Sequence, residues 1–492
     1  MGKIKSVLPK MITEQLVQIR NKQQECLTIN LLASILWKDR NVLTLYHEHS
    51  LVEVNNCTLL RLHKNVSNIA ALESFRMITG ILQELLLLPE LPAVIDVGIL
   101  KDSFEDVNRI TKESLIAKLW YGHLSNTPEQ KDVVLFGFGP TARFLALEMC
   151  EDKATRVKLN LRAIVIKEHV GVEEFNKMAS LIDNTGDGRQ GSIVEIDENH
   201  QGLIINGHFV YVIHKKDTGE VNYRNYGIDG AILIDTWVRY SSKQSLEQHL
   251  NCPGIAKVIL AGSCRDIPHI IFGVNHDLAS SIDSNLYATS SSSSNAIAPV
   301  INILENKYGI IKGHIQYICH TNDQHHLTDV YLHSEKRYNL KDLNDIITEE
   351  KDVGIPAEIF PSLSGRLTSN AIRVPIFKGS LAILVLEMKK KITLEDINEF
   401  FRLSTAAHNK SKLLDISYDN NFDSHYFLRG NPAVAVIEGG STKVSFDGSM
   451  LTLYVWYDKD YSYSRQIINL ASTLETKVRY KLKNREDAFC YN

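Results

Sequence analysis

The chain has 492 residues, a formal net charge of −4 and 44% hydrophobic residues. A chain of this length is too long for one hydrophobic core and predicts about three structural units. The balanced charge gives no electrostatic reason to expect a nucleic acid or an anionic membrane surface as a partner. No run reaches the roughly 20 apolar residues of a membrane span, and no signal peptide is evident. We therefore expect a cytoplasmic protein with neither nucleic-acid nor membrane partners.

The cysteines and histidines favour neither a disulfide framework nor a metal site. The seven cysteines are scattered and include no Cys-x-x-Cys pair, which suits a reducing compartment. His47, His49 and His63 lie among polar neighbours without a second pair of ligands. Such histidines are more typical of the surface or the core than of metal coordination, so we predict no metal site.

Residues 1–130 are predicted to be mainly helical. Leu72, Phe75 and Leu82, for example, share one face at helical spacing. No motif with an evident chemical role occurs in this part of the chain.

A strand, a glycine turn and a helix follow in succession from residue 131. Residues 133–136 predict a buried strand, Gly137-Phe138-Gly139 follows, and residues 141–149 have helical spacing. Residues 163–166 then predict a second strand. A Gly-x-Gly turn at a strand-to-helix junction lets a pyrophosphate approach the backbone at the helix N-terminus. We therefore predict a dinucleotide site at this turn.

The end of the second strand bears on which dinucleotide is bound. Glu168 lies about where an acidic side chain would bind the adenosine ribose. Lys167 precedes it, and a basic residue there could meet a 2′-phosphate. The sequence thus leaves NAD and NADP as alternatives.

Further apolar runs predict that the sheet continues. Residues 203–205 and 209–213 flank Asn206-Gly207, which is a hairpin turn signal. Residues 231–234, 258–260 and 270–274 are short apolar runs, some of which could extend a parallel sheet.

Five consecutive serines occupy residues 290–294. Such a run can be a flexible linker. However, Pro299 suits a first helical turn, Gly309 can end that helix, and residues 315–320 read as a strand. Hydroxyl and N–H groups at the start of a helix form an anion site. The alternative to a linker is therefore the edge of a binding site.

The remaining chain predicts a second mixed domain. Residues 381–388 and 451–456 predict strands, and the last thirty or so residues predict a helix. Thr393 predicts a helix start, with Ile397, Phe400 and Phe401 on the buried face.

With these elements and motifs in this order along the sequence, the chain resembles the phosphorylating glyceraldehyde-3-phosphate dehydrogenase family. Within that family it resembles the longer bacterial subgroup with a helical N-terminal extension. The resemblance spans roughly residues 30–475 and rests on the GFG turn and on several further motifs: Gly273-Val274-Asn275-His276, Ser294-Asn295-Ala296-Ile297-Ala298-Pro299, Thr321-Asn322-Asp323-Gln324, Leu367-Thr368-Ser369-Asn370-Ala371-Ile372-Arg373-Val374-Pro375 and Trp456-Tyr457-Asp458.

The resemblance implies an α/β fold with a Rossmann NAD(P)-binding domain and an α+β catalytic domain. The expected domains are a helical extension over 1–130, the Rossmann domain over 131–289, the catalytic-type domain over 290–455, and a C-terminal helix over 456–492 that returns to the Rossmann domain. The resemblance also implies NAD or NADP as cofactor and a phosphorylated small molecule as ligand. It implies the glycolytic oxidation of glyceraldehyde 3-phosphate as the reaction and a homotetramer as the assembly.

The family's catalytic residues map onto unusual side chains. The position of the nucleophilic cysteine holds Ser292, and Ser291 and Ser293 keep hydroxyls beside it for phosphate. An unassisted serine is a weak nucleophile at neutral pH. An ungapped alignment puts Cys319 at the position of the catalytic histidine, with His320 one residue later. Strand side chains alternate between faces, so His320 would point away unless a bulge intervenes.

Other binding positions are partly kept. Lys459 stands where the family has the asparagine that fixes the nicotinamide amide. Thr368 and Arg373 match the family's phosphate-binding threonine and arginine. Arg373 could hold an anion through a bidentate contact or could form a structural ion pair.

These residues predict a catalytically impaired relative, a pseudoenzyme that binds a nucleotide or phosphometabolite or acts through protein contacts. The alternative is an active NAD(P)-dependent aldehyde dehydrogenase, with Ser292 or, in a reversed arrangement, Cys319 as nucleophile. A third reading is a structural subunit that binds no nucleotide.

Overall fold

The computed structural model describes the following parts of the chain: residues 10–40, 42–47, 49–52, 54, 56–57, 59–60, 63, 71–88, 94–104, 110–115, 130–151, 159–167, 172–183, 185, 192–215, 221–237, 242–264, 266–320, 347–349, 359–374, 379–407, 414–417, 428, 431 and 433–474. The contacts divide the chain into two compact units, which are described separately. The first comprises Met1–Glu129, Asp152–Val157 and Val478–Asn492, and the second Gln130–Glu151 and Lys158–Lys477.

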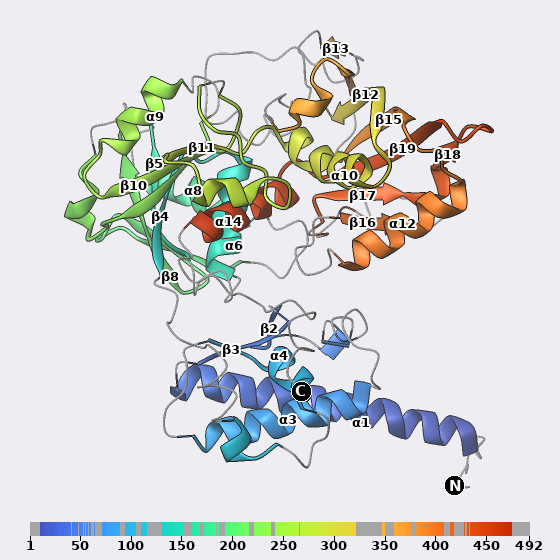
Figure 1. Cartoon of the computed structure of the whole chain (residues 1–492). Coiled ribbons are helices and arrows are strands. Elements are labelled where there is room, and N and C mark those ends of the chain that lie inside the picture. Colours follow the sequence, from blue (N-terminus) through green and yellow to red (C-terminus); the bar gives the residue numbers. More distant parts are fainter. Residues whose placement is uncertain are drawn as a thin grey trace, which may run out of the picture. The chain divides into compact units, whose positions relative to one another are not determined.

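The first unit combines helices with a small sheet (Figure 1). Its described helices include α1 (Lys10–Arg40), α3 (Ala71–Leu86) and α4 (Val97–Asp102), and its sheet has the order β2-β1-β3, with β1 Leu43–Tyr46, β2 His49–Ser50 and β3 Val94–Asp96. One face of α1 carries buried residues at helical spacing, which pack with Phe75 and Leu82 of α3: Cys26, Ile29, Ala33 and Leu36. The prediction of a mainly helical extension is confirmed, and the sheet is an addition that the sequence did not indicate.

A buried lysine of α4 makes a polar contact with α3. Lys101 is 1% exposed, and its ammonium pairs with the Asp102 carboxylate at 2.9 Å. The same ammonium lies 3.3 Å from the Ser74 hydroxyl. A buried charge is tolerated only when it is paired and hydrogen-bonded, and these two contacts meet that requirement.

The second unit opens with a predominantly parallel sheet of eight strands. Its order is β11-β10-β9-β4-β5-β8-β7-β6. The strands are β4 Lys131–Phe136, β5 Leu159–Ile166, β6 Val194–Asp197, β7 Gly202–Ile205, β8 His208–His214, β9 Ala231–Asp235, β10 Ile255–Leu260 and β11 Leu286–Ala288. Six of them run parallel, and β6 and β7 extend one side as antiparallel strands. This is the doubly wound order of a Rossmann domain, with β4 at the point where the strand order reverses.

Helices cover both faces of this sheet. Residues of α6 (Pro140–Glu151), α8 (Val172–Asp183) and α14 (Tyr461–Leu474) share one apolar core, and Leu246 of α9 (Lys243–Leu250) belongs to the core on the other face. The C-terminal helix α14 lies beside α6, next to the eight-stranded sheet that contains β4 (Figure 1). Its return to the Rossmann domain agrees with the fold that the resemblance implied.

Two details of the sheet test the sequence predictions. Asn206 and Gly207 have φ of 50° and 77°, and both residues of the β7–β8 turn are therefore left-handed, as the hairpin signal predicted. Residues 270–274, in contrast, form no strand. Ile271 is buried in a small cluster with Ala298 of α10 (Ser292–Tyr308), so its burial in a loop explains the apolar run.

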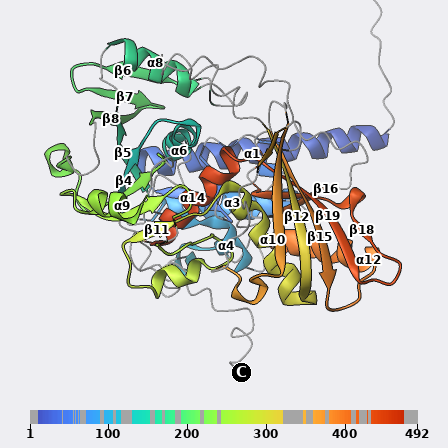
Figure 2. The same ribbon diagram turned by 90° about the horizontal axis from the view of Figure 1, so that it is seen from above.

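The second sheet of this unit carries the other half of the predicted site. Its order is β13-β14-β12-β15-β19-β17-β16, and β18 also pairs with β19. The strands are β12 Ile310–His320, β13 Ile347–Glu349, β14 Leu367–Val374, β15 Ser380–Met388, β16 Leu414–Ser417, β17 Ala435–Glu438, β18 Lys443–Val444 and β19 Met450–Tyr457. Figure 2 shows β12, β15 and β19 side by side. The predicted α/β fold with a second, α+β domain is confirmed.

Two helices pack on this sheet. The core contains residues of α10 (Ser292–Tyr308) and α12 (Leu394–Ala407), including Ile397 and Phe401 as predicted. Thr393 accepts a hydrogen bond from the Asp396 N–H at 3.1 Å, which confirms the predicted start of α12. None of the helices in the described part of the chain is long and apolar enough to cross a bilayer.

Candidate functional site

The glycine turn after β4 contains two glycines with different surroundings. Gly137 has φ of 101°, and its N–H donates to Val165 O at 2.9 Å. A Cβ at Gly137 would lie 2.6 Å from Thr236 Oγ1, so the turn requires glycine both for its φ and for the close packing. A Cβ at Gly139 would meet no atom within 4 Å, so the backbone there faces open space at the start of α6.

The turn after β9 packs against this glycine turn. Thr236 donates to Phe136 O from both its N–H and its hydroxyl, each at 2.9 Å. Trp237 N–H donates to Asp235 Oδ1 at 2.7 Å. The Lys167 ammonium lies 4.6 Å from the centre of the Trp237 ring. Glu168, the predicted ribose ligand, lies outside the described residues.

The serine run is an ordered and strained turn that leads into α10. Ser290 is fully buried and has φ of 61°, a conformation that is rare for a residue with a side chain. Two distant side chains hold it in place. His269 Nδ1 hydrogen-bonds with Ser290 Oγ at 2.7 Å, and the Tyr463 hydroxyl donates to Ser290 O at 2.8 Å. The linker reading of this run is therefore wrong.

The helix begins at Ser292, earlier than predicted. Ser291 is the N-cap, and its hydroxyl accepts a hydrogen bond from the Ser294 N–H at 3.1 Å. Pro299 lies inside α10 and not in its first turn, because the cap lies upstream in the serine run. Burial of the apolar residues around Pro299 offsets the missing N–H, and Gly309 ends the helix as predicted.

The first turn of α10 lies within the serine run. Ser292 and Ser293 are the first two residues of the helix, where backbone N–H groups have no partner in the preceding turn. The helix dipole adds partial positive charge at this end. Among the described residues, no side chain hydrogen-bonds with the Ser292 hydroxyl.

Cys319 faces the same core as α10. Ile315, Tyr317 and Cys319 alternate along β12 and pack in the cluster that contains α10. Cys319 Sγ lies 3.7 Å from the Tyr457 hydroxyl. Burial raises the pKa of Tyr457 well above its usual range, with the Cys319 thiol adding to the rise and a hydrogen bond with Ser293 opposing it. The tyrosine thus joins the strand thiol to the helix start.

Two cations lie beside this thiol. Arg373 of β14 is the register partner of Cys319, and it interacts electrostatically with Lys459. Burial is the main reason why the pKa of Lys459 is lowered, and the Arg373 guanidinium lowers it further. Asp460, Cys319 and Asp458 act in the opposite direction. The structure therefore brings Lys459, Arg373 and Cys319 together. The side chain of His320 lies outside the described residues, although its backbone ends β12.

Thr368 and Arg373, each predicted to bind phosphate, lie on opposite faces of β14. The Thr368 hydroxyl hydrogen-bonds with His314 Nδ1 at 2.9 Å, and this face carries exposed residues. Positions five apart on a strand point to opposite faces, so Thr368 and Arg373 diverge. A motif match alone does not reveal this.

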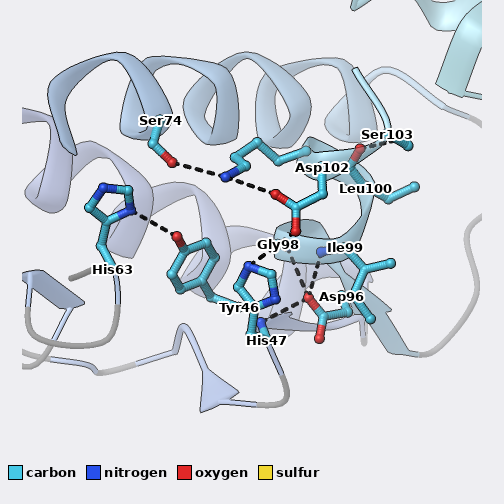
Figure 3. A network of polar contacts seen from close by, with 11 residues as sticks. Tyr46, His47, His63, Ser74, Asp96, Gly98, Ile99, Leu100, Asp102 and Ser103 are labelled. Carbon is cyan, nitrogen blue, oxygen red and sulfur yellow. Dashed lines mark hydrogen bonds and ion pairs between the residues drawn. The ribbon is translucent and has the colours of Figure 1, made fainter. Parts of the chain in front are cut away.

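Two histidines of the first unit, His47 and His63, make contacts within its core. His63 Nδ1 hydrogen-bonds with the Tyr46 hydroxyl at 3.0 Å, and His47 Nε2 lies 3.5 Å from Asp102 Oδ2 (Figure 3). Both histidines are buried, and burial raises the pKa of Tyr46 to about 12. Within the described residues, no group of three His, Cys, Asp or Glu side chains could hold a metal ion.

Known proteins resemble this chain in sequence. The family model described as "Glyceraldehyde 3-phosphate dehydrogenase, C-terminal domain" matches residues 291–459. The chain is 30% identical over 447 residues to the glyceraldehyde-3-phosphate dehydrogenase-like protein of Pseudomonas aeruginosa (strain UCBPP-PA14), which covers 88% of this chain and 95% of that protein. The chain belongs to the glyceraldehyde-3-phosphate dehydrogenase family. It is also 28% identical over 285 residues to glyceraldehyde-3-phosphate dehydrogenase 1 of Bacillus cereus, over 58% of this chain and 83% of that enzyme.

The two comparisons differ in what they cover. The alignment with the Pseudomonas protein is longer than residues 131–492 alone, so it includes part of the N-terminal extension. The Bacillus enzyme matches a much shorter part of this dehydrogenase-like chain. The predicted resemblance to the long subgroup of the dehydrogenase family is confirmed.

Three supporting residues of this dehydrogenase fold escaped sequence reasoning: His269, Tyr457 and Tyr463. Tyr463 contacts the serine loop across 173 positions of sequence, a separation that no local pattern can reveal. Tyr457 was visible only as the middle residue of the Trp456-Tyr457-Asp458 motif. The roles of Ser292, Cys319 and Arg373 in this family site remain predictions.

Proposed function

We propose that the protein is a catalytically impaired member of the glyceraldehyde-3-phosphate dehydrogenase family that binds NAD or NADP together with a phosphorylated metabolite. One observation carries the proposal: the side chain that faces the helix start from β12 is the Cys319 thiol, in contact with Tyr457, while the helix start itself presents Ser292. Both partners of the inherited chemistry are exchanged, yet the scaffold that positions them is kept.

The nucleotide half fits a dinucleotide. The open space at Gly139 and the left-handed Gly137 leave room for a pyrophosphate at the start of α6. The turn lies at the carboxyl ends of parallel strands where the order reverses, which is where α/β sheets bind ligands. The cofactor, when bound, would supply a hydride acceptor.

The other half of the proposed site, at the start of α10, fits an anion. The N-terminus of α10 offers the N–H groups of Ser292 and Ser293, and Arg373 and Lys459 add two cations. A guanidinium can hold a phosphate oxygen pair through two parallel hydrogen bonds. A phosphorylated metabolite is the ligand whose charge best matches this set.

The chemistry is weakened for two reasons. A serine hydroxyl needs an aligned base to become a nucleophile, and the position that maps to the family's histidine base holds Cys319. A serine ester would also be less activated than a thioester toward attack by phosphate. Binding is therefore retained where covalent turnover is impaired.

The direct test is an activity assay combined with a binding assay. Purified full-length protein is given glyceraldehyde 3-phosphate, phosphate and NAD or NADP, and formation of the reduced cofactor is followed at 340 nm. We expect a turnover far below the usual enzyme range of roughly 1–10³ s⁻¹. Calorimetric titration is expected to show binding of at least one dinucleotide. Turnover within the usual range would overturn impairment, and binding of neither dinucleotide would favour a structural subunit.

A second candidate function is an active aldehyde dehydrogenase with Cys319 as nucleophile. The observation that favours it is the pair of cations, Lys459 and Arg373, that would stabilise a thiolate at Cys319. Sulfur would add to the aldehyde carbon, hydride would leave for the oxidised cofactor, and phosphate would displace the thiol from the thioester. In this case Cys319→Ser abolishes turnover and Ser292→Ala does not, whereas a serine-based enzyme gives the reverse pattern.

The family resemblance also leads us to propose a cytoplasmic homotetramer. Light scattering coupled to size-exclusion chromatography measures the mass of the assembly directly. A mass of about four chains supports this proposal, and a mass of one 55.6 kDa chain contradicts it.

A further inference from the structure

An aromatic ring and a cation meet above the glycine turn of the Rossmann sheet. Lys167 follows β5 and Trp237 follows β9, and these two strands flank β4. The Lys167 ammonium lies 4.6 Å from the centre of the Trp237 ring, which is within the range of a cation–π interaction. The two side chains therefore bridge the carboxyl end of β4, where the sheet order reverses.

The backbones on both sides of this bridge are fixed. Lys167 O accepts a hydrogen bond from His214 Nε2 at 3.0 Å, and Trp237 N–H donates to Asp235 at 2.7 Å. The backbone nitrogen of Trp237 lies 3.7 Å from the point where a Cβ at Gly137 would stand. Opening the bridge thus requires rotation of the lysine side chain and no rearrangement of the sheet.

We propose that Trp237 is the stacking platform for the purine ring of the dinucleotide and that Lys167 selects the 2′-phosphorylated form, NADP. This inference rests on the proposed nucleotide binding. A purine that takes the place of the ammonium on Trp237 keeps the ring face covered, because every base presents a π-face. The displaced ammonium then lies at the end of the second strand of the Rossmann order, beside the adenosine ribose.

The selection follows from charge. NAD would displace Lys167 from the aromatic ring and give it only a hydroxyl in return. NADP would give the same ammonium a phosphate, for which lysine is a common partner in proteins. The exchange therefore favours the ligand that carries a charge at the 2′ position.

The test is calorimetric titration of the full-length protein with NADP and NAD, and with 2′,5′-ADP and 5′-AMP as shorter probes. We expect NADP and 2′,5′-ADP to bind at least about tenfold more tightly than NAD and 5′-AMP, a difference of about 1.4 kcal/mol. Lys167→Met is expected to remove this preference and to leave NAD affinity within about threefold. The matched control is Lys257→Met, because the Lys257 ammonium lies 5.9 Å from the Tyr287 ring on β10 and β11, away from the glycine turn.

Tryptophan fluorescence provides an independent readout. Nucleotide binding is expected to change the emission of the wild-type protein, and Trp237→Phe is expected to remove most of this change while leaving the fold, measured by circular dichroism, intact. Binding of neither dinucleotide would overturn the proposed function and this inference together. Binding of both with equal affinity, or a preference for NADP that survives Lys167→Met, would overturn this inference alone.

Discussion

The nucleotide half and the nucleophile half of the site differ in what encodes them. The nucleotide half is encoded by the backbone: Gly137 at φ of 101° and the open space at Gly139 form it, and no reactive side chain is needed. The nucleophile half keeps an equally specific backbone, with Ser290 at φ of 61° and Ser291 capping α10. Its side chains, however, are Ser292 and Cys319, where the family's chemistry needs a cysteine and a histidine.

This difference separates binding from turnover. Backbone N–H groups and helix dipoles bind anions whatever side chains surround them, whereas covalent catalysis depends on one nucleophile and one aligned base. Under the proposed function, the buried and well-anchored serine loop would bind an anion without forming a covalent intermediate.

Restoring the reactive pair tests the nucleophile half most strongly. In the double variant Ser292→Cys/Cys319→His, we expect turnover of glyceraldehyde 3-phosphate to rise by about 10²–10⁴-fold, because an aligned general base contributes about that much. The assay follows the reduced cofactor at 340 nm. Ser292→Cys alone is expected to gain far less, since it lacks the base.

A matched control keeps the same chemistry and moves it by one residue. Ser293→Cys/Cys319→His places the thiol one position further along α10 and is expected to remain inactive. Equal activity in the two double variants would show that the mapping of Ser292 to the nucleophile position is wrong.

The two glycines separate folding from binding in the nucleotide half. Gly137→Ala is expected to destabilise the second unit by about 1–3 kcal/mol, because alanine is strained at this φ and its Cβ would meet Thr236. The Cβ of Gly139→Ala would meet no atom within 4 Å, so we expect its free energy of unfolding to stay unchanged. We expect its affinity for the dinucleotide to fall. Urea denaturation and calorimetry measure the two effects. If Gly139→Ala leaves the dinucleotide affinity unchanged, the pyrophosphate does not bind at this turn.

The fold could be predicted from sequence because local signals and the global architecture agree. Asn206-Gly207 fixed a hairpin, and apolar runs marked β4, β5, β9 and β10. The run over residues 270–274 misled because burial in a loop has the same composition as burial in a strand. Pro299 misled because a buried helix tolerates proline when its cap lies upstream.

The site was less predictable than the fold. The sequence could locate Ser292 and Cys319 by motif spacing, but not the face on which a strand residue lies in the context of its sheet. Thr368 and Arg373 belong to one motif, yet their side chains lie on opposite faces of β14. The anchors of the serine loop, His269 and Tyr463, come from distant segments and carry no motif.

The anchor at Tyr463 should contribute an intermediate amount. Its hydroxyl contacts Ser290 O at 2.8 Å and Thr289 Oγ1 at 2.7 Å, so Tyr463→Phe is expected to lower the free energy of unfolding by about 1–2 kcal/mol. Tyr454→Phe, on a half-buried position of β19, is the control and is expected to change little.

The effect of Tyr463 should also depend on pH. Burial raises the pKa of Tyr463, and a hydrogen bond with Thr289 opposes the rise. A raised folded-state pKa gives stability that is fully present below the unfolded value near ~10 and is lost as the pH rises toward the folded value. The stability difference between wild type and Tyr463→Phe is therefore expected to shrink above about pH 10. A difference that grows in this range would contradict the burial of this hydroxyl.

The smallest expected effect concerns the N-cap of α10. Ser291→Ala removes the hydroxyl that accepts from Ser294 N–H and is expected to cost about 1 kcal/mol of stability. Ser242→Ala removes a similar cap, with Ser245 N–H at 3.2 Å, from α9, which lies on the opposite face of the first sheet from α6 and α14. Both variants should lose similar stability in urea, because the cap chemistry is the same. Only Ser291→Ala should weaken the binding of inorganic phosphate, because only that cap orders the N–H groups beside Ser292. If both variants, or neither, lose phosphate affinity, the anion site does not lie at the start of α10.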